Sequence, residues 1–553
     1  MPQIPPWARI AIATVLIAAA VPVVARLEVE AGNDAWIDTG GPAWRDLQRV
    51  EALFGRSDGF VIGLLAPDAL SAESFAWQER IAAAAADLPG VERIASLATA
   101  TDVAVIDGEL EAVPLVPRAV RSGGPWPPGA RERILGHPLY AGLLVSPAGD
   151  ACAIAIEPGR AQDERALALM QDRLERIIAA DPAPGEALLA GLPAHKRAIS
   201  RVVNRDQRLT VPLTFVVMVL LLSVFLRDAR AVVVAALAVP TALIWTYSVI
   251  AATGTPLDAV LGLLPPLVMG TTVITSLHLL TGHAHTVRSG GHRVRDSLRR
   301  VCVPLSLTTV ATIAGLIGLW WGAVPAVRSF ALFATAGVVA AVSAPILWLW
   351  VASHWLSGVS AARLSAGPLG VRHDGVFARL AGWCARRRRG VIVTAVGVLA
   401  AAVWGITRVE TDCDFLTALP ASDPVRDAQV RIGDRLTGPL ALEVVVALPR
   451  LPRDSDLAAL ARCATALRSA PGVTHVTTLA DVIALVRARG GGTADDADLL
   501  DDVRIFAPAA WRQVVGPGLD GAGSTLRISA RQLDGSVAAA TAAGERVAAL
   551  ARR

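Results

Sequence analysis

The stretch AVVVAALAVPTALIWTYSVIAA, residues 231–252, contains no charged side chain. A helix of this length reaches about 30 Å, which is the thickness of the hydrocarbon core of a bilayer. The stretch therefore predicts a transmembrane helix. Similar apolar blocks on either side of it predict further spans at residues 10–25, 209–226, 257–281, 301–321, 327–355 and 391–407.

The whole composition agrees with a membrane protein. Of the 553 residues, 53% are hydrophobic and 18% are charged, and the mean hydropathy is +0.50. Soluble domains have about 25% charged residues. The first apolar block is also compatible with a cleaved signal peptide. It lacks a clear A-x-A cleavage site and is followed by further spans, so we favour an uncleaved anchor.

The placement of arginines predicts the orientation of the spans. Arg227 and Arg230 follow the second span, the segment HAHTVRSGGHRVRDSLRR (283–300) follows the fourth, and Arg386–Arg389 precede the last. With alternating helices these basic loops share one side, which the positive-inside rule makes cytoplasmic. We therefore expect a bacterial inner-membrane protein whose amino terminus is cytoplasmic and whose large domains are extracytoplasmic.

The two predicted outer segments resemble each other. Each has a strand-like run, FVIGLLAP (60–67) or LEVVVALP (442–449), followed by an Ala-rich helical stretch. These stretches end in LPGVERIASLATATDV (88–103) and APGVTHVTTLADVIAL (470–485). The shared core P-G-V-x-x-[IV]-x-[ST]-L indicates a duplicated α/β module.

The order of predicted elements within the first copy is typical of a split βαβ, or ferredoxin-like, fold. We expect two strands within YAGLLVSPAGDACAIAIEP (140–158), a helix near 165–180 and a last strand at EALLAG (186–191). In the second copy we expect a strand at STLRISARQ (524–532) and a helix near 535–552.

Several local stretches resemble those of one transporter superfamily. They are Phe54–Gly55 before a strand, GTPLDAVLGLLPPLV (254–268), VPLSLTTVATIAGLIGL (303–319) and VPAVRSFALFATAGVVAA (324–341). Together with the arrangement of spans and outer domains, these stretches resemble the RND superfamily, in particular the MMPL and hopanoid-type lipid exporters, relatives of Patched and the sterol-sensing proteins. The matching positions that we expect to have structural roles are Pro304, Gly315, Gly318, Arg328 and Gly337.

The resemblance implies a division of the chain. The expected parts are a first transmembrane helix at 1–26, a porter-like outer domain at 27–208, helices two to six at 209–356, a cytoplasmic basic linker at 357–390, a seventh helix at 391–407 and a second, incomplete porter-like domain at 408–553. It also implies proton-driven export of lipids or other hydrophobic compounds.

The chain departs from the family in two respects. Proton-coupled members place a carboxylate in the fourth helix, where this sequence reads GTTVITSLHLL (270–280), and no Asp or Glu lies deep in any predicted span. The five helices expected after the second outer domain are also missing from this chain. We therefore expect either a truncated product or a split transporter whose other half is a separate polypeptide. A lipid-sensing or accessory membrane subunit is the alternative.

Candidate transport residues are the polar side chains of the fourth and fifth spans. His278 could carry protons because imidazole titrates near neutrality, or it could lie at the interface or bond to a carbonyl. Hydroxyls along the two spans could line a pathway, although such groups commonly bond to their own helix. These hydroxyls belong to Thr271, Thr272, Thr275, Ser276, Thr308, Thr309 and Thr312.

Other classes of function find no support in the sequence. It contains no GxSxG, P-loop, HExxH or Rossmann motif, so we expect neither an enzyme nor a bound cofactor. The five cysteines are widely spaced, and His283, His285 and His292 fit a solvated basic loop better than a metal site. The acidic stretches near Asp34 and Asp412 also fit solvated loops better than cation sites. No basic patch suggests nucleic acid. The expected partners are membrane lipids and the separate polypeptide, and a homo-oligomer is a further option.

Overall fold

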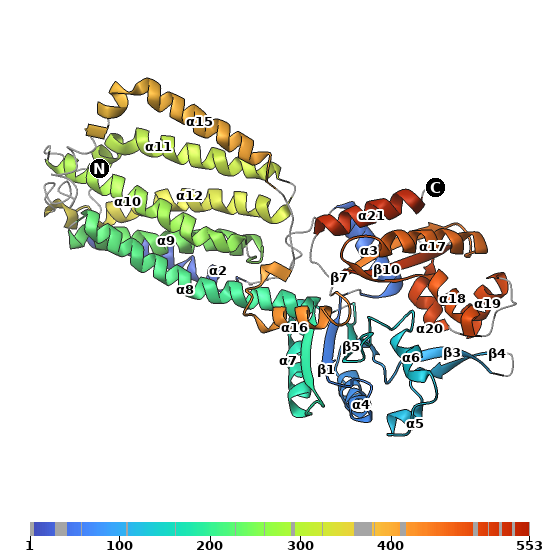
Figure 1. Cartoon of the computed structure of the whole chain (residues 1–553). Helices are drawn as coiled ribbons and strands as arrows, with labels where there is room; N and C mark the ends of the chain where they lie inside the picture. Colours follow the sequence, from blue (N-terminus) through green and yellow to red (C-terminus); the bar gives the residue numbers. More distant parts are fainter. Residues whose placement is uncertain are drawn as a thin grey trace. The chain divides into compact units, whose positions relative to one another are not determined.

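Two units of different architecture make up the chain, and each is described by itself. Met1–Asp38 and Ser200–Glu410 form a helical unit, and Thr39–Ile199 with Thr411–Arg553 form a unit of sheets and helices (Figure 1). The computed structural model describes residues 5–27, 41–56, 58–106, 109–160, 162–226, 228–258, 260–288, 294–322, 324–358, 379–380, 382–409, 416–438, 440–489, 496–506, 508–518, 523–532 and 537–551.

Among these described residues, seven helical segments are long and apolar enough to cross a membrane. They are α1 with α2 (Pro6–Ala18, Val21–Val24), α8 (Leu192–Leu226), α9 (Ala229–Thr253), α10 (Leu264–Arg288, after the 3-10 turn Leu261–Leu263), α11 (Val294–Gly318, before the 3-10 turn Leu319–Trp321), α12 (Pro325–Ala352, before the 3-10 turn Trp355–Gly358) and α15 (Arg388–Ile406). The prediction of about seven apolar helices in a multi-pass membrane protein is confirmed at this level.

Several helices extend beyond the apolar blocks that predicted them. Helix α8 begins 17 residues before the predicted span at 209, since it starts at Leu192. The segment 283–288, expected as part of a solvated loop, is the last part of α10, and α11 already begins at Val294. Backbone hydrogen bonds continue into water, whereas the apolar pattern marks only the part that hydrocarbon would cover.

Helices α9, α10 and α12 form the core of the helical unit. Small side chains bring them close together, among them Ala238, Ala242 and Ala341, which are fully buried. At Gly337 of α12, an added Cβ would lie 2.7 Å from Cγ2 of Val268 on α10. Gly337 therefore permits close helix packing, as small residues do between transmembrane helices.

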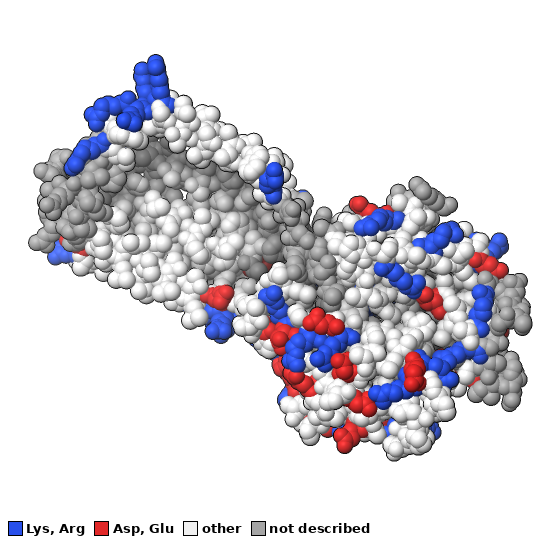
Figure 2. Space-filling view, in the orientation of Figure 1, with Lys and Arg blue, Asp and Glu red and all other residues white. Residues whose placement is uncertain are grey.

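The helices alternate in direction within the bundle. Arg9 at the start of α1 donates to the Trp350 carbonyl (3.2 Å) and to Ser353 Oγ (2.9 Å) at the end of α12. At the opposite end, Ser248 Oγ of α9 donates to the carbonyl of Ala20 after α1 (3.2 Å). Figure 2 shows that charged side chains are nearly absent along the exposed face of the bundle and appear at its ends. Such a surface fits a bilayer with polar interfaces on both sides.

The first sheet has the connectivity of a split βαβ unit. Its elements are β1 (Phe60–Leu65), α4 (Ala72–Ala86), β2 (Val91–Ala95), β5 (Ala151–Pro158), α7 (Glu164–Ala180) and β6 (Glu186–Gly191). The strand order is β2-β5-β1-β6, and every neighbouring pair is antiparallel. Alternate residues of the strands, such as Phe60, Ile62 and Ile154, are fully buried.

The second sheet repeats this connectivity in its described residues. It contains β7 (Leu440–Leu448), α17 (Asp454–Arg468), β8 (Val473–Thr477), β9 (Val515–Pro517), β10 (Ser524–Gln532) and α21 (Val537–Ala551). The order β7-β10-β8 corresponds to β1-β5-β2 of the first sheet, and β9 pairs with the other end of β10.

The two copies agree in local detail at the motif found in the sequence. Gly90 and Gly472 each follow a helix with a positive φ, +90° and +78°, and each precedes a strand. After the strand, the Ser96 N–H donates to Thr99 Oγ1 (3.1 Å), and the Thr478 N–H donates to an Asp481 carboxylate oxygen (2.9 Å). The same turn in both places supports a duplicated module.

Each copy contributes its leading helix to the sheet of the other copy. Helix α16 (Pro424–Gly433) lies before β7 but contacts β6, and an added Cβ at Gly63 in β1 would lie 2.6 Å from Cγ1 of Ile432. Helix α3 (Pro42–Phe54) lies before β1 but places Phe54 against Gly516 of β9. This exchange joins the two sheets into one unit.

Between the strands that the two copies have in common, the secondary structure differs from the prediction. Only one strand, β5, forms within 140–158; residues 140–146 form tight turns closed by bonds such as Leu144 N–H to the Tyr140 carbonyl (2.8 Å). The segment that follows β2 forms a hairpin with no counterpart in the prediction. The additional elements here and in the second copy are β3 (Thr101–Ile106), β4 (Glu109–Pro114), α5 (Arg118–Arg121), α6 (Ala130–Leu135), the 3-10 turn Leu416–Ala418, α18 (Leu479–Arg489), α19 (Asp496–Phe506) and α20 (Pro508–Val514).

Candidate functional site

The predicted hydroxyls of α10 lie mostly on its inner face. Thr271 and Thr272 donate to the carbonyls of Leu267 (2.8 Å) and Val268 (2.6 Å), four residues earlier in the same helix. Thr275 and Ser276 are buried, and Ser276 Oγ has no hydrogen-bond partner in the described part of the chain. The buried hydroxyls of Thr275 and Ser276 thus lie within the bundle core.

His278 lies on a different face of α10 from the buried hydroxyls. Its side chain is exposed, as is that of Ile274 one turn earlier, and its imidazole has no partner among the described residues. At about 100° per residue, His278 points almost opposite to Ser276. The structure therefore does not bring His278 together with the inner hydroxyls.

The candidate hydroxyls of α11 bond to their own helix. Thr308 Oγ1 donates to the Pro304 carbonyl (2.8 Å), Thr309 Oγ1 to Leu305 (2.7 Å) and Thr312 Oγ1 to Thr308 (2.9 Å). These bonds satisfy each hydroxyl donor locally, which is common for Ser and Thr in transmembrane helices. Pro304 lies inside α11 without ending it.

The motif residues expected to have structural roles differ in the contacts that they make. Gly337 permits close packing, whereas an added Cβ at Gly315 or Gly318 would meet no atom within 4 Å in the described chain. Gly315 and Gly318 therefore make no close helix contact within the described residues, because α11 exposes most of its surface. Arg328 Nε donates to the Gly322 carbonyl (2.7 Å), which ties the start of α12 to the preceding loop.

The carboxylate of Asp258, in the turn before α10, has a structural role. Asp258 is 8% exposed and accepts a hydrogen bond from the Leu261 N–H at 2.7 Å, which satisfies a donor at the beginning of the helix.

His283, expected in a solvated loop, is instead buried in α10, and its Nδ1 lies 2.8 Å from Ser297 Oγ of α11. That expectation is wrong because α10 continues past it. His292, Asp34 and Asp412 lie outside the described residues.

A buried ion pair lies on the face of the second sheet opposite its hydrophobic core. Arg527 on β10 donates two hydrogen bonds to the carboxylate of Glu443 on β7, both 2.7 Å, and Ser529 Oγ donates a third at 3.0 Å. The Arg527 guanidinium also lies 5.4 Å from the centre of the Phe54 ring on the exchanged helix α3. Burial raises the pKa of the nearby Glu157 carboxyl above its ordinary value, and the charges of Arg93 and Arg527 partly offset that rise.

A second polar cluster joins the hairpin β3–β4 to the second copy. Asp102 of β3 accepts a hydrogen bond from Arg489 at the end of α18 (2.6 Å) and lies 3.3 Å from His137 Nε2. The Leu139 N–H donates to His137 Nδ1 at 3.2 Å, which leaves the ring proton on Nε2, facing Asp102. Tyr140 stacks on His137, and burial, together with the charge of Asp102, raises the pKa of its phenol.

Sequence reasoning missed both clusters. Arg527 and Ser529 alternate with apolar residues in a predicted strand, so they could have been assigned to its polar face. Their partner Glu443 lies 84 positions before Arg527 and 86 before Ser529, and the pairing depends on strand order. The Asp102–His137–Arg489 cluster has no comparable signal, because the hairpin that carries Asp102 was not predicted.

Comparisons with known proteins leave the family open: no protein-family model matches this chain, and no curated protein sequence matches it significantly.

Proposed function

We propose that this chain is a membrane transporter of the RND/MMPL type that exports lipid-like or hydrophobic substrates. The observation that carries the proposal is the pair of duplicated split βαβ units, joined by the exchange of α3 and α16, in a chain whose described residues include seven apolar helices. Helix α8 supports it further, because it runs without interruption from β6 into an apolar span. Substrate would pass through the outer α/β units, and motions of the spans would reach these units through α8.

We propose an orientation in which the end of the bundle with Arg9 and Arg230 is cytoplasmic and the α/β units are outside the inner membrane. The positive-inside rule supports this. An impermeant maleimide applied to intact cells tests it on two thiols. We expect Arg173→Cys, on the exposed side of α7, to react and the native Cys384 to react only after lysis; the reverse pattern would overturn the orientation.

We propose that a separate polypeptide supplies further spans, as in a split transporter. In the apolar window of α15 no residue is buried, and in that of α11 only 6% are, whereas in those of α10 and α12 half are. Lipid alone could cover these faces, but the exposed His278 on α10 is costly in hydrocarbon. Cross-linking in native membranes, with mass spectrometry of the adducts, would separate a second gene product from a second copy of this chain.

A lipid-sensing or accessory subunit is the second candidate, favoured by the lack of any Asp or Glu deep in the spans. The experiment that separates it from export compares inner-membrane lipids in cells with and without the chain. Export predicts that removal makes one lipid class accumulate in the inner membrane and disappear from the outer layers. Sensing predicts altered lipid synthesis instead, with no such displacement between membranes.

A matched pair of variants on α16 connects this assay to the exchanged helices. Ile432 is 5% exposed and lies against the first sheet, whereas Val430 of the same helix is 40% exposed. We expect Ile432→Asp to fail in complementing the deletion and Val430→Asp to succeed. Equal complementation by both variants would show that export does not need the exchanged arrangement.

A further inference from the structure

The polar face of the second sheet, opposite its hydrophobic core, carries an arginine without a bonded partner. Arg527, Ser529 and Arg531 alternate along β10 with residues of that core, so all three side chains project from the polar face. Arg531 is partly buried, and its guanidinium makes no ion pair or hydrogen bond within the described residues. Such a group has lost water without gaining a protein partner, which is unfavourable.

The two carboxylates that act on Arg531 through their charge are already paired with other arginines. Glu443 accepts three hydrogen bonds from β10, two of them from Arg527. Glu157 of β5 lies 3.5 Å from a guanidinium nitrogen of Arg93. Burial lowers the pKa of the Arg531 guanidinium below its ordinary value, and the charges of Glu443 and Glu157 only partly offset that effect. In the described structure Arg531 is thus left without a hydrogen-bonded counterion.

A second hydrogen-bonding side chain lies directly beside Arg531. His475 on β8 is its opposite residue in the antiparallel register, so both side chains project from the same face. The Cβ atoms of such a cross-strand pair are about 4.5–5.5 Å apart, and one small group can contact both side chains. Both residues are partly exposed, so a ligand in solution can reach them.

The imidazole of His475 can act as a donor while it is neutral. Burial lowers the pKa of His475, and the charge of Arg531 lowers it further, so the ring is uncharged at neutral pH. Nε2 lies 2.9 Å from Thr477 Oγ1. When the Thr477 hydroxyl donates to Nε2, the ring proton is on Nδ1 and is available to a ligand.

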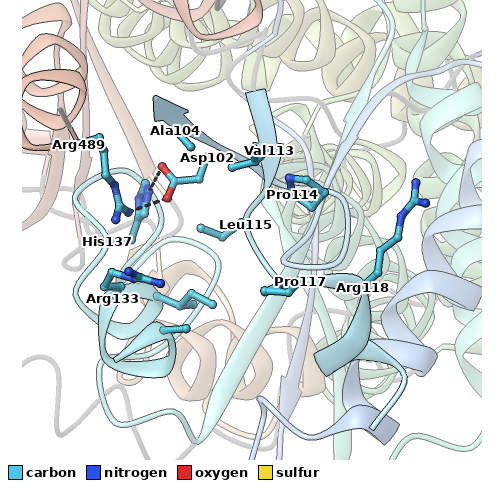
Figure 3. Close-up of a pocket in the computed structure, with 12 residues that line it drawn as sticks. Asp102, Ala104, Val113, Pro114, Leu115, Pro117, Arg118, Arg133, His137 and Arg489 are labelled. Carbon is cyan, nitrogen blue, oxygen red and sulfur yellow. Dashed lines mark hydrogen bonds and ion pairs between the residues drawn. The ribbon is translucent and has the colours of Figure 1, made fainter. Parts of the chain in front are cut away.

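The arginines around the cavity of about 530 Å³ beside the hairpin β3–β4 are placed differently (Figure 3). Arg489 in its wall is paired with Asp102 at 2.6 Å. Figure 3 shows Arg118 and Arg133 on opposite sides of apolar lining residues, with Arg118 turned away from the cavity. Arg531 and His475, by contrast, are immediate neighbours on one face.

We propose that Arg531 and His475 form a binding site for an oxyanion, the carboxylate or phosphate group of a small molecule. The planar guanidinium of Arg531 donates two parallel hydrogen bonds to this group, and His475 donates a third. Glu443 and Glu157 oppose the anion only weakly, because each is paired with its own arginine. The identity of the oxyanion as the headgroup of an exported lipid rests on the proposed function, whereas its binding does not.

Calorimetry on the full chain in nanodiscs of zwitterionic lipid tests the site with inorganic phosphate and hexyl phosphate, at constant ionic strength in chloride. We expect saturable binding of phosphate at one site. Arg531→Gln should bind at least about tenfold more weakly, as expected for lost charge-assisted hydrogen bonds. Arg462→Gln removes an exposed arginine of α17 in the same copy and should bind like the unchanged chain.

Thermal unfolding separates lost binding from lost folding. Arg531→Gln removes a charge that has no bonded partner, so its midpoint without phosphate should not fall. Phosphate should raise the midpoint of the unchanged chain and of Arg462→Gln, because a ligand stabilises the folded state that binds it, but should not raise that of Arg531→Gln. Equal phosphate binding by the two variants, or no saturable binding of either phosphate to the unchanged chain, would overturn the proposal.

The two probes distinguish the sources of the oxyanion. Tighter binding of hexyl phosphate supports a lipid headgroup, whereas equal affinity supports free phosphate and removes the connection to a lipid. Phosphate binding by a chain that exports nothing would refute the proposed function and leave this site standing. Export by a chain that binds neither probe would refute the site and leave the proposed function standing.

Discussion

Replacing Glu443 with Gln tests the buried ion pair of the second sheet. The change removes the charge that compensates Arg527, whose side chain is 13% exposed while that of Glu443 is 8% exposed. Removing one partner of a buried pair costs about 3–5 kcal/mol. We expect the lower end, about 3 kcal/mol, because Arg527 keeps its contact with the Phe54 ring and the charge of Glu157 nearby.

Cys463 provides the assay in the full chain. It is 4% exposed and lies in the hydrophobic core on the other side of β10, so a thiol reagent reaches it only when that core opens. A loss of about 3 kcal/mol accelerates its labelling about a hundredfold, since each 1.4 kcal/mol corresponds to a factor of ten. Mass spectrometry distinguishes Cys463 from the other cysteines.

Two controls sharpen the result. Asp46→Asn disrupts an exposed pair with Arg49, whose side chains are 69% and 62% exposed, and should leave labelling unchanged. The double variant Glu443→Leu/Arg527→Met should label far more slowly than Glu443→Gln, because replacing both charges leaves no buried ion unpaired. Equal labelling in Glu443→Gln and Asp46→Asn would refute the reasoning.

Three further predictions concern other parts of the chain. Gly337→Val should destabilise the purified protein by about 1–3 kcal/mol and lower its thermal midpoint, because the new side chain would collide with Val268. Gly315→Val, which has open space around it, is the control, and equal midpoints of the two variants would contradict the close packing at Gly337. Burial raises the pKa of Glu157 above 4.5, so its contribution to stability is most favourable below pH 4.5 and declines as the pH rises through the raised pKa. Glu157→Gln should therefore flatten the decline of the thermal midpoint over this pH range. An unchanged slope would contradict the raised pKa of Glu157. His278→Ala should leave the yield of folded protein unchanged, because the His278 side chain is exposed. A lower yield would show that the imidazole makes a stabilising contact.

Strands with clean boundaries could be predicted from the sequence almost to the residue. EALLAG and STLRISARQ coincide with β6 (Glu186–Gly191) and β10 (Ser524–Gln532). Both are alternating or apolar runs next to glycine, and both bury one face against a helix layer. The run at 140–146 failed as a strand because its N–H groups bond within tight turns, to carbonyls such as that of Tyr140.

The packing of helices on sheets and on one another could not be predicted from the sequence. The residues of α3 and α16 show that each is an amphipathic helix, but either sheet would satisfy such a face. The sequence also did not show whether His278 faces the inside of the bundle or its surface, because the apolar residues of a transmembrane helix face both lipid and protein. Candidate site residues could thus be named from composition, while their grouping depended on packing.

The proposal that this chain exports a lipid-like substrate is tested most directly by release of lipid from spheroplasts. Cells carrying a deletion of the chain would be pulse-labelled with radioactive acetate, converted to spheroplasts and incubated with a lipid acceptor. We predict release of a labelled lipid that the unchanged chain and Val430→Asp restore and that Ile432→Asp does not restore. Equal release with and without the chain would contradict it.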